Sequence, residues 1–169
     1  MPPSDFDIIF KALQDAGVRY LVVGGVAVVL HGHLRFTADL DLIVALDAAN
    51  VRAAVSALGA LGYRPRAPVP AEQLADPATR WQWVEEKGLT VFSLWSPQHP
   101  ATEVDIFVEE PFPFEEDYGR ATRAEVGGAQ ITVASIPDLI ALKRRVGRPK
   151  DIEDIAALEA IEQEVERRG

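Results

Sequence analysis

The stretch from Leu21 to Val44, LVVGGVAVVLHGHLRFTADLDLIV, carries the signals that decide the fold. Its β-rich start ends at Gly24-Gly25, and the apolar run Val26–His33 predicts a helix directly after the glycines. Residues Thr37–Val44 then predict a strand. A glycine pair between a strand and a helix lets backbone N–H groups approach a ligand, and the start of a helix favours negative charge. Alone, such a pair more often marks only a tight turn.

Two aspartates stand on the second predicted strand. Residues two apart on a strand share a face, so Asp39 and Asp41 point one way while Leu40 and Leu42 point to the core. Two hard oxygen ligands on one rigid element suit Mg²⁺, which prefers one or two carboxylates plus substrate phosphates. An Asp-x-Asp pair also arises by chance, but this one follows Gly25 by fourteen residues. That context favours an anion and metal site.

A third carboxylate beside such a pair is needed to activate a hydroxyl. The alternating stretch Glu103–Val108 predicts a strand with Glu103 and Asp105 on one face. A solvated strand face is the alternative interpretation. Asp105 is the better candidate of the two, because its neighbours Ile106 and Val108 are more strongly core-like.

The rest of the pattern predicts a single mixed α/β domain over residues 1–169, with a core of residues 18–134 and a C-terminal helical part of residues 135–169. Residues 64–77 are expected to form a mostly irregular connection, and the acidic segment Pro111–Asp117 is expected to be a loop. The other expected helices are Ser4–Gly17, Asp47–Leu61, Ala78–Lys87, a helix capped by Ser135 that ends at Val146, and one opened by Pro149; the other strands are Leu89–Trp95 and a hairpin of Arg123–Val126 with Gln130–Ala134.

Composition narrows the classes of function. The 169 residues are 48% hydrophobic and 25% charged, as in an ordinary globular protein. The absence of cysteine excludes disulfides, cysteine-ligated zinc, iron–sulfur clusters and a thiol nucleophile. The net charge of −9 argues against binding long duplex DNA. The apolar runs are too short to cross a membrane and the N-terminus lacks a basic leader, so a cytoplasmic location is expected.

The charge is unevenly distributed along the chain. Five of nine residues from Glu109 to Asp117 are acidic, and this run is interpreted as solvated surface. Five of eight residues from Lys143 to Lys150 are basic. They suit a helix end through its dipole, but Lys143 falls on the edge of the inward face, while Arg144 and Arg145 turn toward solvent. Lys143 is therefore predicted to be functional, with little loss of stability on its substitution.

These features together resemble a known superfamily. Gly-Gly, thirteen intervening residues, Asp-Leu-Asp-Leu and a later strand aspartate are similar to the nucleotidyltransferase superfamily with the polymerase-β-like fold. Residues Lys143, Arg148, Lys150-Asp151 and Asp154 resemble the C-terminal motif of its AbiEii-type branch, which includes abortive-infection and toxin–antitoxin enzymes. The resemblance implies a mixed twisted sheet with helices packed on it and two C-terminal helices folding back toward the site.

The resemblance also implies Mg²⁺-dependent transfer of a nucleoside monophosphate from an NTP such as ATP to an acceptor hydroxyl, with two Mg²⁺ ions. Many relatives have serine at the place of Gly25, so one hydroxyl contact to phosphate is missing here. The implied roles are triphosphate binding by the amides of Gly24 and Gly25, metal binding by Asp39, Asp41 and Asp105, activation of the hydroxyl by Asp105, charge neutralisation by Lys143, and orientation by Asp151 or Asp154; Arg35 and Thr37 lie on the rim, where Arg35 contacts phosphate or is simply exposed.

The acceptor and the biological setting stay open from sequence. The acceptor is RNA, a protein or a small molecule, and a cognate toxin or antitoxin protein is a candidate partner. One alternative is a catalytically degenerate module that binds a partner protein in the manner of an antitoxin, and another is an antibiotic nucleotidyltransferase. Trp81, Trp83 and Trp95 are candidates for stacking a base, or are core or lid packing.

Overall fold

A computed structural model describes residues 3–169 and contains a mixed sheet of seven strands within that range. The strand order is β3-β4-β5-β2-β1-β7-β6. The pairings β1–β7 and β2–β5 are parallel, and the others are antiparallel. The strands are β1 (Tyr20–Val23), β2 (Leu40–Val44), β3 (Arg64–Pro65), β4 (Val91–Trp95), β5 (Val104–Phe107), β6 (Thr122–Val126) and β7 (Ala129–Val133). The expected mixed α/β fold is therefore confirmed.

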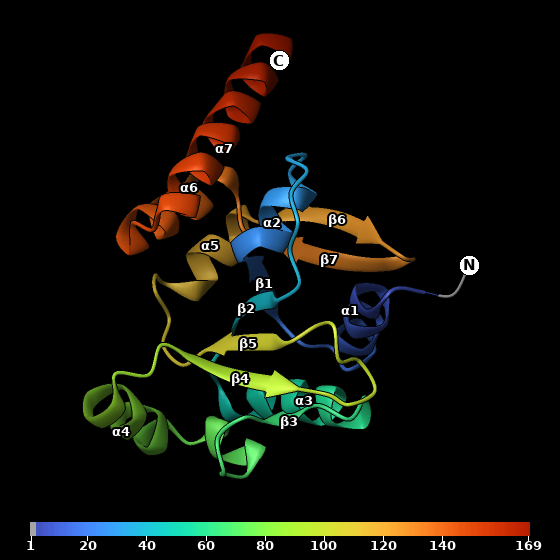
Figure 1. Cartoon of the computed structure of the whole chain (residues 1–169), viewed down its shortest axis with the longest axis vertical. Coiled ribbons are helices and arrows are strands. Elements are labelled where there is room, and N and C mark those ends of the chain that lie inside the picture. The colour runs from blue at the N-terminus through green and yellow to red at the C-terminus, as the bar shows by residue number, and fades with distance from the viewer. Residues whose placement is uncertain (1–2) are drawn as a thin grey trace.

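Helices cover the sheet and extend beyond it. Figure 1 shows α3 behind the strands and the red α7 leading away from the body. The first helix is capped by the preceding Ser4, whose side chain accepts a hydrogen bond from the amide of Asp7. No helix of residues 3–169 is long and apolar enough to cross a membrane. The helices are α1 (Asp5–Asp15), α2 (Gly24–Leu30), α3 (Ala48–Ala60), a 3₁₀ helix η1 (Ala71–Ala75), α4 (Pro77–Lys87), α5 (Phe114–Arg120), α6 (Ile136–Val146) and α7 (Pro149–Arg168).

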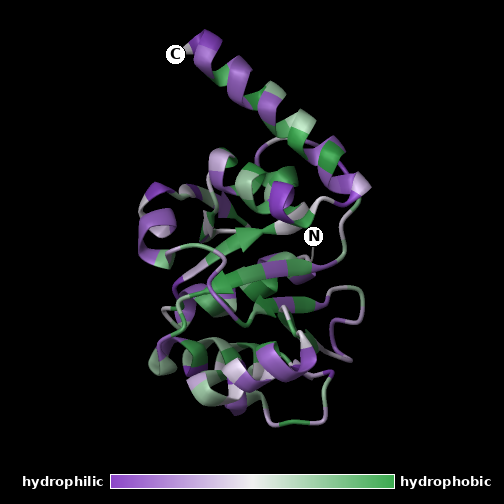
Figure 2. Cartoon of the chain, turned by 90° about the vertical axis from the view of Figure 1, so that its left-hand side faces the viewer, coloured by the Kyte–Doolittle hydropathy of each residue, from purple (hydrophilic) through white to green (hydrophobic). Residues whose placement is uncertain are grey.

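The hydrophobic core is centred on the two middle strands. All four residues of β1 are buried, and β2 is buried except for Asp41. Figure 2 shows hydrophobic strands gathered inside the body, whereas hydrophilic and hydrophobic residues alternate along α7. A strand that is buried on both faces is held rigidly, so Asp41 has a fixed platform.

The strand that carries Asp41 is shorter than predicted. It begins at Leu40, whose amide donates to the carbonyl of Glu103, and residues 37–39 form no ladder. Asp39 therefore precedes the strand instead of standing on it. The preceding helix begins at Gly24 itself, two residues earlier than predicted, so Gly24 and Gly25 belong to its first turn.

The acidic segment before residue 118 was wrongly predicted to be irregular. Residues Phe114–Arg120 form α5, which buries Phe114 and Asp117 three residues apart on one face. One face of this helix is thus packed against the body, because a buried aromatic anchors its first turn. Residues 64–77 likewise contain β3 and η1, the latter with Leu74 fully buried.

Candidate active site

One cavity of about 620 Å³ collects the residues for which the resemblance implies a role in catalysis, metal binding or phosphate binding. Its size falls in the range of small-molecule sites. It lies where β1, β2 and β5 meet the two C-terminal helices. The predicted residues that line it are Gly24, Gly25, Arg35, Thr37, Asp39, Asp41, Asp105, Lys143, Asp151 and Asp154.

Three carboxylates form the sheet side of this cavity. Asp41 and Asp105 are register partners on the neighbouring parallel strands β2 and β5. Their side chains therefore leave the sheet on the same face and at the same level. Asp39 lies one residue before β2 and is exposed at the same cavity. By contrast, Glu103 pairs with Arg66 and is not part of the cavity wall.

The electrostatics of this side are unfavourable in the absence of a cation. Burial, together with the charges of Asp105 and Asp39, raises the pKa of Asp41 to about 7. Burial is also the main cause that raises the pKa of Asp105. Oδ1 of Asp105 is buried and has no hydrogen-bond partner. Clustered and unsatisfied carboxylates of this kind cost stability and mark functional sites.

The donor chemistry fits a hard divalent cation, although the side chains are not arranged as a closed metal site. Among residues 3–169, no group of three His, Cys, Asp or Glu side chains is placed to hold a metal ion. The available donors are nevertheless carboxylate oxygens alone, which Mg²⁺ prefers, and one of them is the unpaired oxygen of Asp105.

The two glycines are required by the close approach of other side chains. Gly24 has φ of +70°, and a Cβ there would lie 2.0 Å from Oδ2 of Asp41. A Cβ on Gly25 would lie 2.8 Å from the hydroxyl oxygen of Thr37. Any side chain at either position would therefore displace a residue of the cavity. The hydroxyl of Thr37 occupies the space that a larger residue 25 would need.

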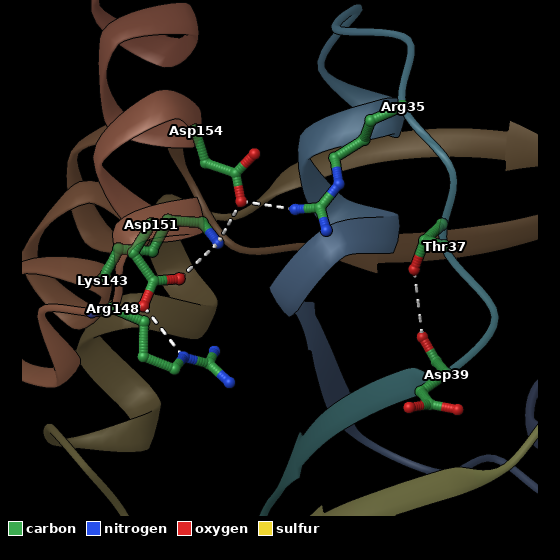
Figure 3. A network of polar contacts seen from close by, with 7 residues as sticks. All are labelled: Arg35, Thr37, Asp39, Lys143, Arg148, Asp151 and Asp154. Carbon is green, nitrogen blue, oxygen red and sulfur yellow. Dashed lines mark hydrogen bonds and ion pairs between the residues drawn. The ribbon is translucent and has the colours of Figure 1, made fainter.

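The opposite side of the cavity is cationic and built by the C-terminal helices. Figure 3 shows Lys143 and Arg35 converging on Asp154, while Arg148 contacts Asp151. Nζ of Lys143 lies 3.0 Å from Oδ2 of Asp154 and 3.6 Å from Oδ1 of Asp151. Nη1 of Arg35 donates to the same oxygen of Asp154 at 2.5 Å. Three cations thus alternate with two carboxylates.

Asp151 is held by two hydrogen bonds from Arg148 in addition to its ion pair with Lys143. Its Oδ2 accepts hydrogen bonds from the backbone amide and from Nε of Arg148, at 3.1 and 3.0 Å. The hydrogen bonds and charges of Arg148 and Lys143 outweigh burial and hold the pKa of Asp151 below its usual value. Asp151 therefore stays ionised and fixes both cations at the edge of the cavity.

The sequence matches the model of a known protein family. Residues 8–166 match the model of a family described as "Nucleotidyltransferase of unknown function (DUF6036)". The chain belongs to this family. No protein with a curated description matches the sequence closely enough to count as a relative.

Solved structures share the fold of this nucleotidyltransferase. The lincosamide antibiotic adenylyltransferase LnuA, determined with lincomycin bound, is 17% identical, with a TM-score of 0.62 over 95% of this chain and 99% of that one. The antibiotic-resistance factor ANT(2″)-Ia is 15% identical, with a TM-score of 0.57 over 96% and 90%. An antigenic nucleotidyltransferase-like protein from Paracoccidioides brasiliensis is 16% identical, with a TM-score of 0.50 over 94% and 78%.

The structure corrects one expectation about Lys143. Its side chain is only 7% exposed and is paired with two buried carboxylates, so it does not sit at the edge of the helix face. Its substitution must cost stability as well as charge in the cavity. Arg144 and Arg145 are exposed, as predicted, and contact Glu159 and the carbonyl of Pro111.

Arg148 and Phe36 are among the residues of the cavity that were not assigned a role in the site from sequence. Arg148 belongs to the C-terminal motif, but its contact with Asp151 was not predicted. Phe36 lines the cavity between Arg35 and Thr37. The three tryptophans do not line it; Trp83, for example, packs on Phe92 with ring centroids 5.2 Å apart. An aromatic residue between two polar candidates was the available signal for Phe36.

Proposed function

We propose that this enzyme transfers a nucleoside monophosphate from an NTP to an acceptor hydroxyl and releases pyrophosphate, in a Mg²⁺-dependent reaction. The observation that carries the proposal is the division of one cavity into a side with three carboxylates and a side with Lys143, Arg35 and Arg148. Phosphoryl transfer depends mainly on positioning and charge neutralisation, and this division supplies both.

The carboxylates act at the reacting phosphorus. The acceptor oxygen bonds to the α-phosphorus, the bond from this phosphorus to the bridging oxygen breaks, and pyrophosphate leaves with the electron pair. Asp105 accepts the proton of the acceptor hydroxyl, a role that suits a carboxyl whose pKa is raised by burial. Asp39, Asp41 and Asp105 would hold Mg²⁺, which when bound neutralises charge on the α-phosphate.

The cationic side binds the triphosphate. Lys143 and Arg35 face the β- and γ-phosphates, and Asp154 keeps the two cations beside each other. Backbone amides of Gly24 and Gly25 add hydrogen bonds to the phosphates, and the hydroxyl of Thr37 stands beside them. Residues 18–134 form the transferase core in this proposal, and the helical part 135–169 completes its site.

Two settings are compatible with this chemistry. The C-terminal motif favours the AbiEii-type branch, with RNA or a protein as acceptor and a toxin or antitoxin partner. The likeness in fold to LnuA over nearly the whole of both chains favours a small-molecule acceptor as the second candidate. Radiolabelled transfer from each α-labelled NTP into cell lysate, followed by separation of RNA, protein and small-molecule products, distinguishes them.

The metal and nucleotide site is tested by calorimetry with ATP, GTP, CTP and UTP in the presence of Mg²⁺. We expect the wild-type protein to bind at least one NTP, and the double variant Asp39→Ala/Asp41→Ala to lose this binding. Asp15→Ala is the matched control, since this aspartate pairs with Lys11 on the surface of α1. Equal binding by the wild type and the double variant would mean that these carboxylates take no part in nucleotide binding, which would contradict the proposal.

A further inference from the structure

Phe36 is placed in a way that a large aromatic residue rarely is. Its side chain is 89% exposed, and it lines the cavity of the candidate active site. Leu34 in the same segment is 86% exposed and does not line the cavity. An apolar ring that stays in water at the wall of a polar cavity gains its burial only when a ligand arrives.

The segment that carries Phe36 is tied to the body of the protein by the preceding residue. Arg35 donates to Asp154 on α7. On the other side of Phe36, the hydroxyl of Thr37 lies close to Gly25 on α2. The ion pair of Arg35 restrains the backbone beside Phe36, which lowers the entropy lost when a ligand covers the ring.

The position of Phe36 also relates it to one half of the cavity. Its neighbours Arg35 and Thr37 belong to the cationic and glycine side, where the triphosphate lies in the proposed function. Asp105, which receives the proton of the acceptor in the proposed function, stands on β5, and Val91 of the neighbouring β4 lines the cavity together with Thr90, which precedes it. In the proposed function, these neighbours relate the ring to the nucleotide.

We propose that the ring of Phe36 stacks on the base of the bound NTP, an inference that rests on the proposed function. The ring offers a flat apolar face without hydrogen-bonding groups, so it binds any base and favours the larger purine rings. Arg35 and Phe36 then act on one nucleotide from adjacent positions, the first on its phosphates and the second on its base.

The test compares the binding of ATP with that of tripolyphosphate, which has the same charged groups and no base. Both are titrated with Mg²⁺ into the wild type, Phe36→Ala, Phe36→Tyr and the matched control Leu34→Ala. We expect Phe36→Ala to weaken ATP binding by about five- to a hundredfold and to leave tripolyphosphate binding unchanged. Phe36→Tyr and Leu34→Ala should bind both compounds like the wild type.

A second comparison uses GTP, CTP and UTP with the same variants. A purine preference of the wild type should shrink in Phe36→Ala, because the stacking that produces it is gone. Thermal unfolding is expected to be unchanged in every variant, since both substituted side chains are exposed.

The outcomes separate the inference from the function on which it rests. If the wild type binds ATP and Phe36→Ala binds it equally well, the stacking role is wrong and the proposed function stands. Equal weakening of ATP and tripolyphosphate, or an equal effect of Leu34→Ala, also contradicts stacking, because the segment and not the ring would then matter. If the wild type binds no NTP, both proposals fail.

Discussion

Nζ of Lys143 lies 3.0 Å from Oδ2 of Asp154, and both side chains are almost completely buried. The same oxygen accepts a hydrogen bond from Arg35, which precedes β2. One carboxylate therefore joins both C-terminal helices to the segment that leads into β2, the strand that carries Asp41. A buried anion between two cations is costly to leave without its partners, so this contact couples the charge of the cavity to the stability of the fold.

Lys143→Ala is expected to abolish transfer and to lower the free energy of unfolding by about 3 kcal/mol, because it leaves Asp154 and Asp151 with one cation fewer. Denaturant unfolding and a transfer assay below the unfolding temperature measure the two effects. Arg144→Ala is the control on the same helix and should behave like the wild type, since its contact with Glu159 is exposed.

The pair can also be tested by a double-mutant cycle. Asp154→Asn in the Lys143→Ala background should cost less stability than Asp154→Asn alone, since no lysine is then left unpaired. Additive losses in this cycle would mean that the observed ion pair does not contribute to stability.

Gly24→Ala is expected to destabilise the protein by more than about 2 kcal/mol and to weaken NTP binding. The backbone at Gly24 has φ of +70°, and its new Cβ would collide with Asp41. Gly59→Ala is the matched control inside α3, where nothing lies within 4 Å of the added Cβ. That variant should gain about 0.5–1 kcal/mol through the unfolded state. If Gly24→Ala keeps the stability and NTP binding of the wild type, Asp41 can move away from the added Cβ without affecting either, and the prediction is wrong.

Asp41→Asn should raise the stability of the metal-free protein while it abolishes transfer. The pKa of Asp41 is raised to about 7, so its charge at pH 8 is unfavourable in the fold, and its removal should gain about 1–3 kcal/mol. Asp39→Asn is the control, because Asp39 is exposed and should change stability little. Denaturant unfolding at pH 8 without Mg²⁺ measures whether Asp41→Asn gains or loses stability relative to the wild type. A less stable Asp41→Asn protein would mean that the charge is satisfied in the fold.

Stability is also expected to fall as the pH rises from about 4 to about 6 because of Asp117. Burial and the charge of Asp138 raise the pKa of Asp117 to about 6, and the second oxygen of each carboxyl is buried without a partner. In this window the folded protein keeps a proton that the unfolded chain has lost, so unfolding becomes easier as the pH rises.

In Asp117→Asn, the fall in the free energy of unfolding over this pH range should be smaller by about 1–2 kcal/mol. Denaturant unfolding between pH 4 and pH 8 measures it. The exposed neighbour Glu116 provides the control Glu116→Gln, which should keep the wild-type slope. An unchanged slope in Asp117→Asn would assign the pH dependence to other groups.

Much of the architecture was predictable because its signals are local. Ser4 and Ser135 cap the helices expected of them, and Gly147 ends α6 in a left-handed conformation. The errors are equally instructive. The acidic run before residue 118 has the composition of a loop, and only the packing of Phe114 in the core makes it a helix. The strand β2 starts only at Leu40, and this start depends on where its partner strand β5 begins.

The amino-acid sequence by itself determined the order of the elements and the types of residue at the site, because periodicity, helix caps and the spacing of Gly25, Asp39 and Asp41 are properties of short stretches. Only the tertiary structure decided which charges meet. Arg35 and Asp154 are 119 residues apart in the chain, and the burial that raises the pKa of Asp41 comes from the strands and helices packed around it. Pairing and desolvation depend on distances in space, and local sequence does not encode them.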